Sequence, residues 1–239
     1  MEPPNTTPPE APPERQTRVP AIALLRAYLY LGLAFAWAVA TLTLLSNAGR
    51  LLPWLMFTNA RWGVIAVGGM LLLGWPAVRG IVGYRAGLGV LLLLSTLVGT
   101  IFAMMAVAIR QATLLQVVAI TGLAFAVASL IGQRTRQDLS KVRRAAVLVR
   151  DVVEMVAIGL AASLAGTWFE QGLAVLGIGV AMLVVADDTQ SLGDASMKAS
   201  EEDAPRLAVV HATDMFFDCF RLTHLFLALV RPPKRKRPR

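Results

Sequence analysis

The sequence predicts an all-α integral membrane protein, and its composition and apolar run lengths are the reasons. Of its 239 residues, 56% are hydrophobic and only 16% are charged, and the mean hydropathy is +0.62. A soluble domain carries about 25% charged residues, so this surplus of apolar side chains requires a non-aqueous solvent. Several apolar runs reach roughly 17–24 residues, the length that a helix needs to cross about 30 Å of hydrocarbon. The single cysteine, Cys219, excludes a disulfide scaffold.

The chain divides into a tail, a membrane domain and a second tail. Residues 1–20 hold seven of the 13 prolines and little apolar surface, so we expect a disordered cytoplasmic tail rather than a secretory signal. The membrane domain covers residues 21–230, and a basic tail follows at 231–239. A seventh segment, Leu207–Val230, is apolar but interrupted by ionisable side chains. Before it, we predict six apolar spans, at Ala27–Leu45, Trp62–Val78, Ala86–Ile109, Ala112–Gly132, Val152–Phe169 and Gly172–Ala186.

Basic residues predict the orientation of these spans. The formal charge of +8 and the pI near 10.5 would suggest nucleic-acid binding in a soluble protein, but in a membrane protein they indicate basic loops. Most of the lysines and arginines outside the six spans fall on the side of the amino terminus, whereas Arg50, Arg61 and Arg110 fall on the other. The positive-inside rule therefore places the amino terminus in the cytoplasm. The basic tail after Val230 also prefers that side, so the sequence leaves the seventh segment undecided between crossing and re-entrant.

The seventh segment carries a polar stripe. At about 100° per residue, His211, Asp214, Asp218 and Arg221 fall within roughly 80° on one helix face. An ionisable group in hydrocarbon costs on the order of 3 kcal/mol or more, so the stripe should face the bundle interior or a watery cavity. Two simpler interpretations remain open. In the first, Asp218 and Arg221 form only a local ion pair. In the second, His211, Asp214 and Asp218 form a metal site, which fits the spacing without other support, so no metal is assigned.

A second acidic cluster, Asp187 and Asp188, ends the sixth span. Two aspartates at such a place are ordinarily a solvated helix end, and a functional role arises if one turns inward to meet the seventh segment. No zinc-hydrolase, serine-nucleophile, Walker A or dinucleotide-binding motif occurs in the sequence. We therefore expect no enzyme activity and no cofactor.

Four motifs resemble the transmembrane Bax inhibitor motif family. Asp188-Thr189-Gln190 resembles its DTQ signature, and residues 212–218 with Leu225-Phe226 resemble its ALxLYLDFxNLF helix. Residues 134–140 are similar to its TTKRDLS loop, and residues 25–28 to the LRKxY opening of its first span. The four occur in the family's order on the matching helices, so the resemblance extends from the first span to Val230.

The resemblance implies a seven-helix bundle, with six helices around a central seventh, that acts as a pH-sensitive calcium leak channel. In the family, aspartates from the sixth and seventh helices share a proton and sense pH, and here that pair is Asp188 and Asp218. Asp187 is the alternate for Asp188, because it occupies the position of a family tyrosine. Two carboxylates in contact cannot both ionise cheaply, so the pair titrates as a unit.

The chain departs from the family pattern near this pair. Arg221 replaces an asparagine and places a fixed positive charge near Asp218. That charge either keeps the Asp218 carboxylate ionised or repels a passing cation. Arg79 corresponds to an arginine that serves some relatives as a cytoplasmic latch, but the predicted span Trp62–Val78 contains no acid to pair with it.

Two functions from different classes follow. The first is a cation leak channel, with calcium as the ion, gated by the aspartate pair. The second is a membrane interaction protein that binds another membrane protein and modulates membrane proteolysis or stress survival without conducting ions. In both, the lipid bilayer is a partner and nucleic acid is not. Arginine outnumbers lysine 19 to 4, which suggests a GC-rich bacterial genome and a multi-pass protein of the plasma membrane.

Overall fold

The computed structural model describes residues 13–48, 74–75, 78–109, 111–135, 139, 145–146, 149 and 168–230. Within these residues the regular structure is helical, without strands. The predicted spans Trp62–Val78 and Val152–Phe169 lie outside the described residues except at their ends, and so does the basic tail. The five long helices are α1 (Pro13–Asn47), α4 (Tyr84–Ala108), α5 (Gln111–Arg134), α7 (Trp168–Lys198) and α8 (Ala204–Val230).

Four of these helices contain segments that are long and apolar enough to span a membrane. The segments are Ile22–Asn47, Tyr84–Ala106, Thr113–Arg134 and Gln171–Lys198, which confirms four of the predicted spans by length and composition. Hydroxyl groups within the helices bond to backbone carbonyls one turn earlier, as in Ser95 to Leu91 at 2.7 Å and Thr223 to Cys219 at 2.8 Å. These bonds satisfy polar groups that hydrocarbon would leave without partners.

Two helices are longer than the sequence predicts. α1 begins at Pro13, so residues 13–20 are helical rather than part of the disordered tail. Proline suits the first turn of a helix, where its missing N–H has no partner, and Glu14, Arg15 and Gln16 favour helix. α7 continues for twelve residues beyond Ala186, to Lys198, and Leu192 is fully buried in this extension. Packing of such apolar side chains keeps this stretch helical, although its sequence resembles that of a loop.

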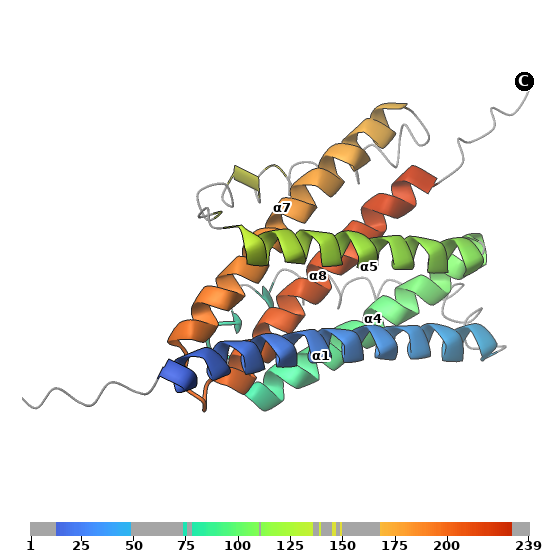
Figure 1. The fold of residues 1–239 in the computed structure, drawn as a ribbon. Helices are drawn as coiled ribbons and strands as arrows, with labels where there is room; N and C mark the ends of the chain where they lie inside the picture. Colours follow the sequence, from blue (N-terminus) through green and yellow to red (C-terminus); the bar gives the residue numbers. More distant parts are fainter. Residues whose placement is uncertain are drawn as a thin grey trace, which may run out of the picture.

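α8 is the central helix of the described part. It packs against α1, α4, α5 and α7 and runs through the middle of the bundle (Figure 1). Phe216 on α8 contacts Phe35 on α1 with ring centroids 5.3 Å apart, and Phe220 contacts Phe102 on α4 at 6.0 Å. The predicted centrality of this segment is therefore confirmed with respect to the four helices described around it.

The two ends of the bundle are distinct. The start of α1, the start of α4, the end of α5 and the turn from α7 to α8 lie together, and we call this the amino end (Figure 1). Gln133 at the end of α5 donates to the Tyr28 hydroxyl of α1 at 3.1 Å, so the end of α5 lies beside the amino-terminal helix. α8 is one uninterrupted helix from the amino end to the opposite end. The described helix therefore does not turn back within the bundle.

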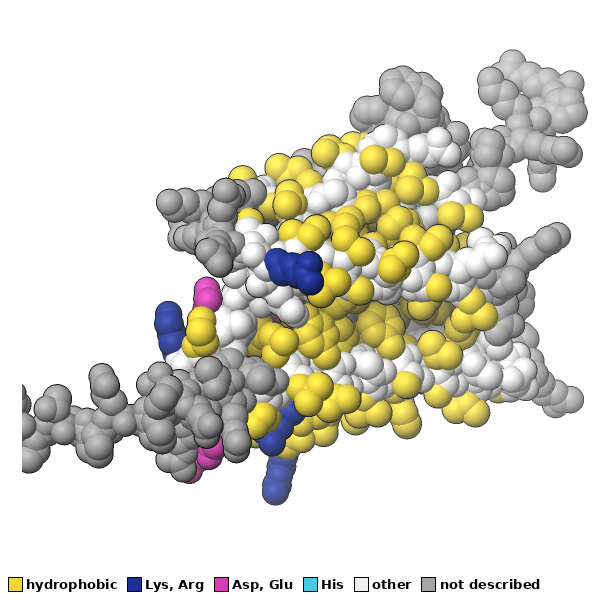
Figure 2. All heavy atoms as spheres, viewed as in Figure 1, with side chains coloured by type: hydrophobic (Ala, Val, Ile, Leu, Met, Phe, Trp, Pro, Cys, Tyr) yellow, Lys and Arg dark blue, Asp and Glu magenta, His cyan; other side chains and the backbone are white. Residues whose placement is uncertain are grey.

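The outer surface is apolar along the helices. Figure 2 shows hydrophobic side chains spread over α1 and α5, with charged groups gathered towards the amino end. Leu29 on α1 and Leu123 on α5 are among the large exposed apolar residues. Such a surface is stable only against lipid tails, which agrees with a multi-pass membrane protein.

Candidate functional site

A cavity of about 440 Å³ lies at the amino end, between α7, α8 and the turn that follows Trp75. The α8 side of the cavity is lined at intervals of three and four residues, which is one face of a helix. The other lining residues come from residues 79–80, from α7 and from the connection between α7 and α8. The complete lining is Arg79, Gly80, Asp188, Ser191, Ala199, Asp203, Arg206, Leu207, Val210, His211 and Asp214.

Asp214 is held by two side chains in the cavity. The indole Nε1 of Trp75 donates to its Oδ1 at 2.6 Å, and Arg79 Nη1 lies 3.5 Å from its Oδ2. The Asp214 side chain is 15% exposed, whereas that of Arg79 is 44% exposed. Arg79 therefore forms an ion pair across the cavity, with an acid on α8 rather than on its own span.

Asp187 and Asp188 are buried, with only 4% and 6% of each residue exposed. They lie within α7, eleven and ten residues before its last residue, Lys198. The interpretation of these aspartates as a solvated helix end is therefore wrong. Asp188 also lines the cavity, so it is the one of the two that faces α8 there.

The two residues after Asp188 join α7 to the end of α5. Thr189 donates to the Ser129 hydroxyl at 3.3 Å. The Gln190 amide donates to the Thr135 carbonyl at 3.0 Å and accepts from the Leu139 N–H at 3.1 Å. The Thr and Gln of the DTQ motif thus bind residues within and beside the motif that follows the fourth predicted span, and they hold the neighbouring aspartates in register with α5.

Asp218 and Arg221 continue the polar face of α8 beyond the cavity. Arg221 Nη1 lies 3.4 Å from Asp218 Oδ1, and their side chains are 19% and 6% exposed. The local ion pair considered from the sequence is therefore present. Asp188 and Asp214 each lie ten residues from the helix ends at the α7–α8 connection, so they are at the same level, and Asp218 is one turn deeper, about 6 Å along the axis.

The structure thus divides the predicted site residues into two groups. Arg79, Asp188, His211 and Asp214 share the cavity, whereas Asp218 and Arg221 pair beyond it. Across the described residues, no group of three His, Cys, Asp or Glu side chains is arranged to hold a metal ion. The spacing of His211, Asp214 and Asp218 therefore does not create a metal site there.

Two residues of the cavity region were not predicted as site residues. Trp75 lies in an apolar span, where a tryptophan is ordinarily a packing residue, and Arg206 enters the sequence argument only as a basic residue beside a span. Both are recognisable only from their distant partners, Asp214 for Trp75 and the turn at residues 80–82 for Arg206.

Comparison with known proteins agrees with the motifs in the sequence. A family model described as inhibitor of apoptosis-promoting Bax1 matches residues 22–232. Searches of curated proteins and of solved structures give no match. The family match covers every helix described above apart from the first turns of α1. The chain therefore belongs to the Bax inhibitor family.

Proposed function

We propose that the protein is a pH-sensitive cation leak channel, with calcium as the ion, gated by Asp188 and Asp218. The observation that carries this proposal is the burial of both carboxylates on the adjoining helices α7 and α8, with Asp188 in a cavity open at the amino end. Intramembrane ionisable residues commonly mark ion or proton pathways. Asp214 lines the cavity at the level of Asp188, one turn from Asp218, and extends the series of carboxylates.

The channel is a seven-helix bundle in this proposal, and the directions of the described helices support that number. α1 ends at the end opposite to where α4 begins, and α5 ends at the end opposite to where α7 begins. In each interval, the two described helix ends therefore lie at opposite ends of the bundle. The predicted spans Trp62–Val78 and Val152–Phe169 fall in these two intervals, and with the five described helices they make seven.

The gate works through one shared proton and one latch. When Asp188 and Asp218 share a proton, α7 and α8 stay close, and when the proton is lost the two negative charges repel. Arg79 closes the cavity side by its ion pair with Asp214 and presents a positive charge to an arriving cation. Arg221, 3.4 Å from Asp218, reduces the repulsion within the pair and sets the pH at which the gate responds. The amino end is cytoplasmic, in the plasma membrane of a bacterium.

Calcium flux through the full-length protein in liposomes tests the proposal. The leak should exceed that of empty liposomes and should change with pH, and Asp188→Asn and Asp218→Asn should each abolish the pH dependence. Asp194→Asn is the matched control, because Asp194 is an exposed aspartate on the same helix α7. An unchanged pH profile in Asp188→Asn, Asp187→Asn and Asp218→Asn alike would refute the aspartate gate.

A second candidate is a membrane interaction protein. The description of the matching family, inhibitor of apoptosis-promoting Bax1, favours action on another protein rather than on an ion. Absence of calcium flux above that of empty liposomes, with correctly folded protein, would favour this second function. The same liposome experiment therefore separates the two candidates.

A further inference from the structure

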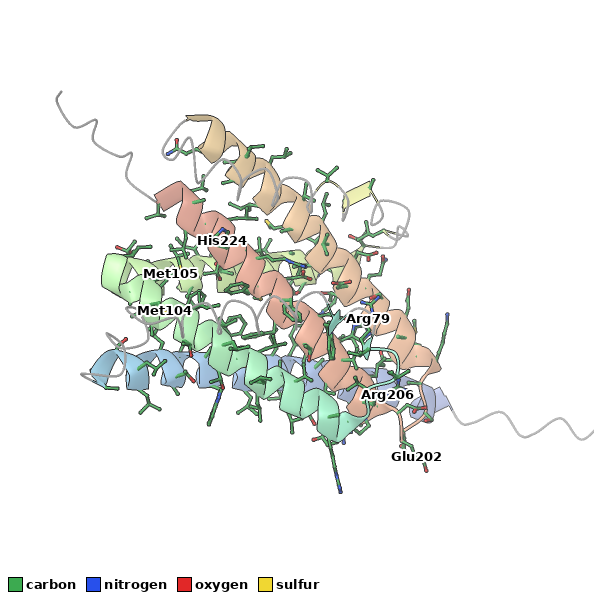
Figure 3. The ribbon with its side chains drawn as sticks, turned by 180° about the vertical axis from the view of Figure 1, so that it is seen from behind. Arg79, Met104, Met105, Glu202, Arg206 and His224 are labelled. Carbon is green, nitrogen blue, oxygen red and sulfur yellow. The ribbon has the colours of Figure 1, made fainter. Side chains whose placement is uncertain are left out.

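Arg206 ties the first turn of α8 to the turn at residues 78–82. Its Nε donates to the Val82 carbonyl at 2.9 Å, and its Nη2 donates to the Gly80 carbonyl. Figure 3 shows Arg206 and Arg79 at the same end of the bundle, beside the beginning of α8. One side chain of α8 thus holds two carbonyls of a segment more than 120 residues earlier in the chain.

The turn needs a donor of this kind. The N–H groups of Ile81 and Val82 bond back to the Val78 carbonyl at 2.9 and 3.0 Å. Carbonyls at the carboxyl end of such a turn are left for other donors, and a planar guanidinium offers two N–H groups in a fixed fork. Arg206 is therefore suited to fix the orientation of the turn as well as its position.

The same turn begins with the residues that hold Asp214. The Arg79 N–H bonds to the Trp75 carbonyl at 2.9 Å, and both side chains reach Asp214. Asp214 is eight residues beyond Arg206 on α8, which is about 12 Å along the helix axis. α8 therefore contacts this short segment at two levels, through Arg206 and through Asp214.

The contact at Asp214 depends on the contact at Arg206. Arg79 is 44% exposed, so its side chain has many alternative conformations in water, and an ion pair of this kind alone contributes little. A turn held in place by Arg206 presents Arg79 and Trp75 to Asp214 with less loss of conformational entropy.

We infer that Arg206 is a positioning residue that keeps Arg79 and Trp75 on Asp214. The inference concerns the geometry of the cavity, and its consequence for ion leak rests on the proposed function. Arg206 itself need not touch a permeating ion.

The test uses Trp75 as a reporter in full-length protein whose other four tryptophans are replaced by phenylalanine. Trp75 is 4% exposed, so loss of its contact with Asp214 should shift its emission to longer wavelength and increase its quenching by acrylamide. Arg206→Ala should produce both changes, and Arg206→Lys should produce smaller ones, because a lysine keeps the charge but not the fork. Asp214→Asn is the positive control, and Arg85→Ala, an exposed arginine at the start of α4, is the negative control.

Circular dichroism and gel filtration establish that each variant is folded, and Arg206→Lys serves if Arg206→Ala does not fold. Unchanged emission in the folded Arg206 variants, with a shift in Asp214→Asn, would overturn the inference. In calcium-loaded liposomes, Arg206→Ala should raise the leak at neutral pH by about tenfold or more, as expected for loss of a hydrogen bond to a charged group. If the emission shifts in the Arg206 variants but neither they nor the parent protein leak calcium, the proposed function is refuted and the positioning role stands.

Discussion

α5 approaches α7 closely at Gly132, and replacement of this residue by alanine should destabilise the protein. A Cβ at Gly132 would contact the carbonyl oxygen of Ala186 and would lie 2.8 Å from its carbonyl carbon and 2.9 Å from its Cα. These are backbone atoms, so the contact can be relieved only by moving one helix. Ala186 directly precedes Asp187, so such a movement also displaces the buried acids of α7.

The magnitude follows from two opposing effects. Overpacking of this kind costs about 1–3 kcal/mol, and alanine in place of glycine in a helix recovers up to about 1 kcal/mol. Gly122→Ala on the same helix is the matched control, because a Cβ there has no neighbour within 4 Å. We therefore expect Gly132→Ala to be less stable than Gly122→Ala by about 1–3 kcal/mol.

Thermal unfolding of the two variants in the same detergent, followed by circular dichroism and by gel filtration after heating, measures this difference. Gly132→Ala should unfold at a lower temperature than the parent protein, and Gly122→Ala at the same or a higher temperature. If Gly132→Ala unfolds at or above the temperature of Gly122→Ala, the close approach of α5 and α7 does not hold.

Three further predictions concern the site. Gln190→Ala removes two hydrogen bonds to residues 135 and 139 and should cost about 2 kcal/mol, seen as a lower unfolding temperature; an unchanged one would mean that the bonds contribute nothing. Arg221→Gln removes the guanidinium 3.4 Å from Asp218, so the midpoint of the pH dependence of calcium flux should move to higher pH, and a midpoint that stays in place would contradict the role given to Arg221. A cysteine in place of the exposed Gln133, in a protein with Cys219 replaced by serine, should be labelled by an impermeant maleimide only from the cytoplasmic side, and labelling from outside intact cells would reverse the orientation.

The helices that contact lipid were predictable because hydrocarbon imposes one simple rule on them. Every residue of a span must be apolar or have an internal partner, so hydropathy and length locate the spans directly. The same rule predicted that the polar face of α8 lies inside, since a lipid-exposed stripe would be too costly. The ends of α1 and α7 were missed because beyond the hydrocarbon both loop and helix are acceptable, and tertiary packing decides between them.

The contacts of the cavity were less predictable, because they join residues that are far apart in the sequence. A search for the partner of Arg79 within Trp62–Val78 finds no acid, and the actual partner, Asp214, lies 135 residues later. Periodicity places Asp214 on the inner face of α8, but it does not say which element that face meets. Only the packed structure identifies Arg79 and Trp75 there.

The continuous course of α8 has a consequence for the charges at the two ends of the bundle. α1 begins at the amino end and α8 ends at the other, so Val230, which precedes the basic tail, lies on the side opposite to Arg79, Arg134 and Arg206. The positive-inside rule cannot be satisfied for both groups of charges. The amino end carries its basic residues in several short connections between spans, where the rule acts most strongly, whereas the tail is a single segment reached after the other spans. We therefore expect the amino end, rather than the tail, to set the orientation.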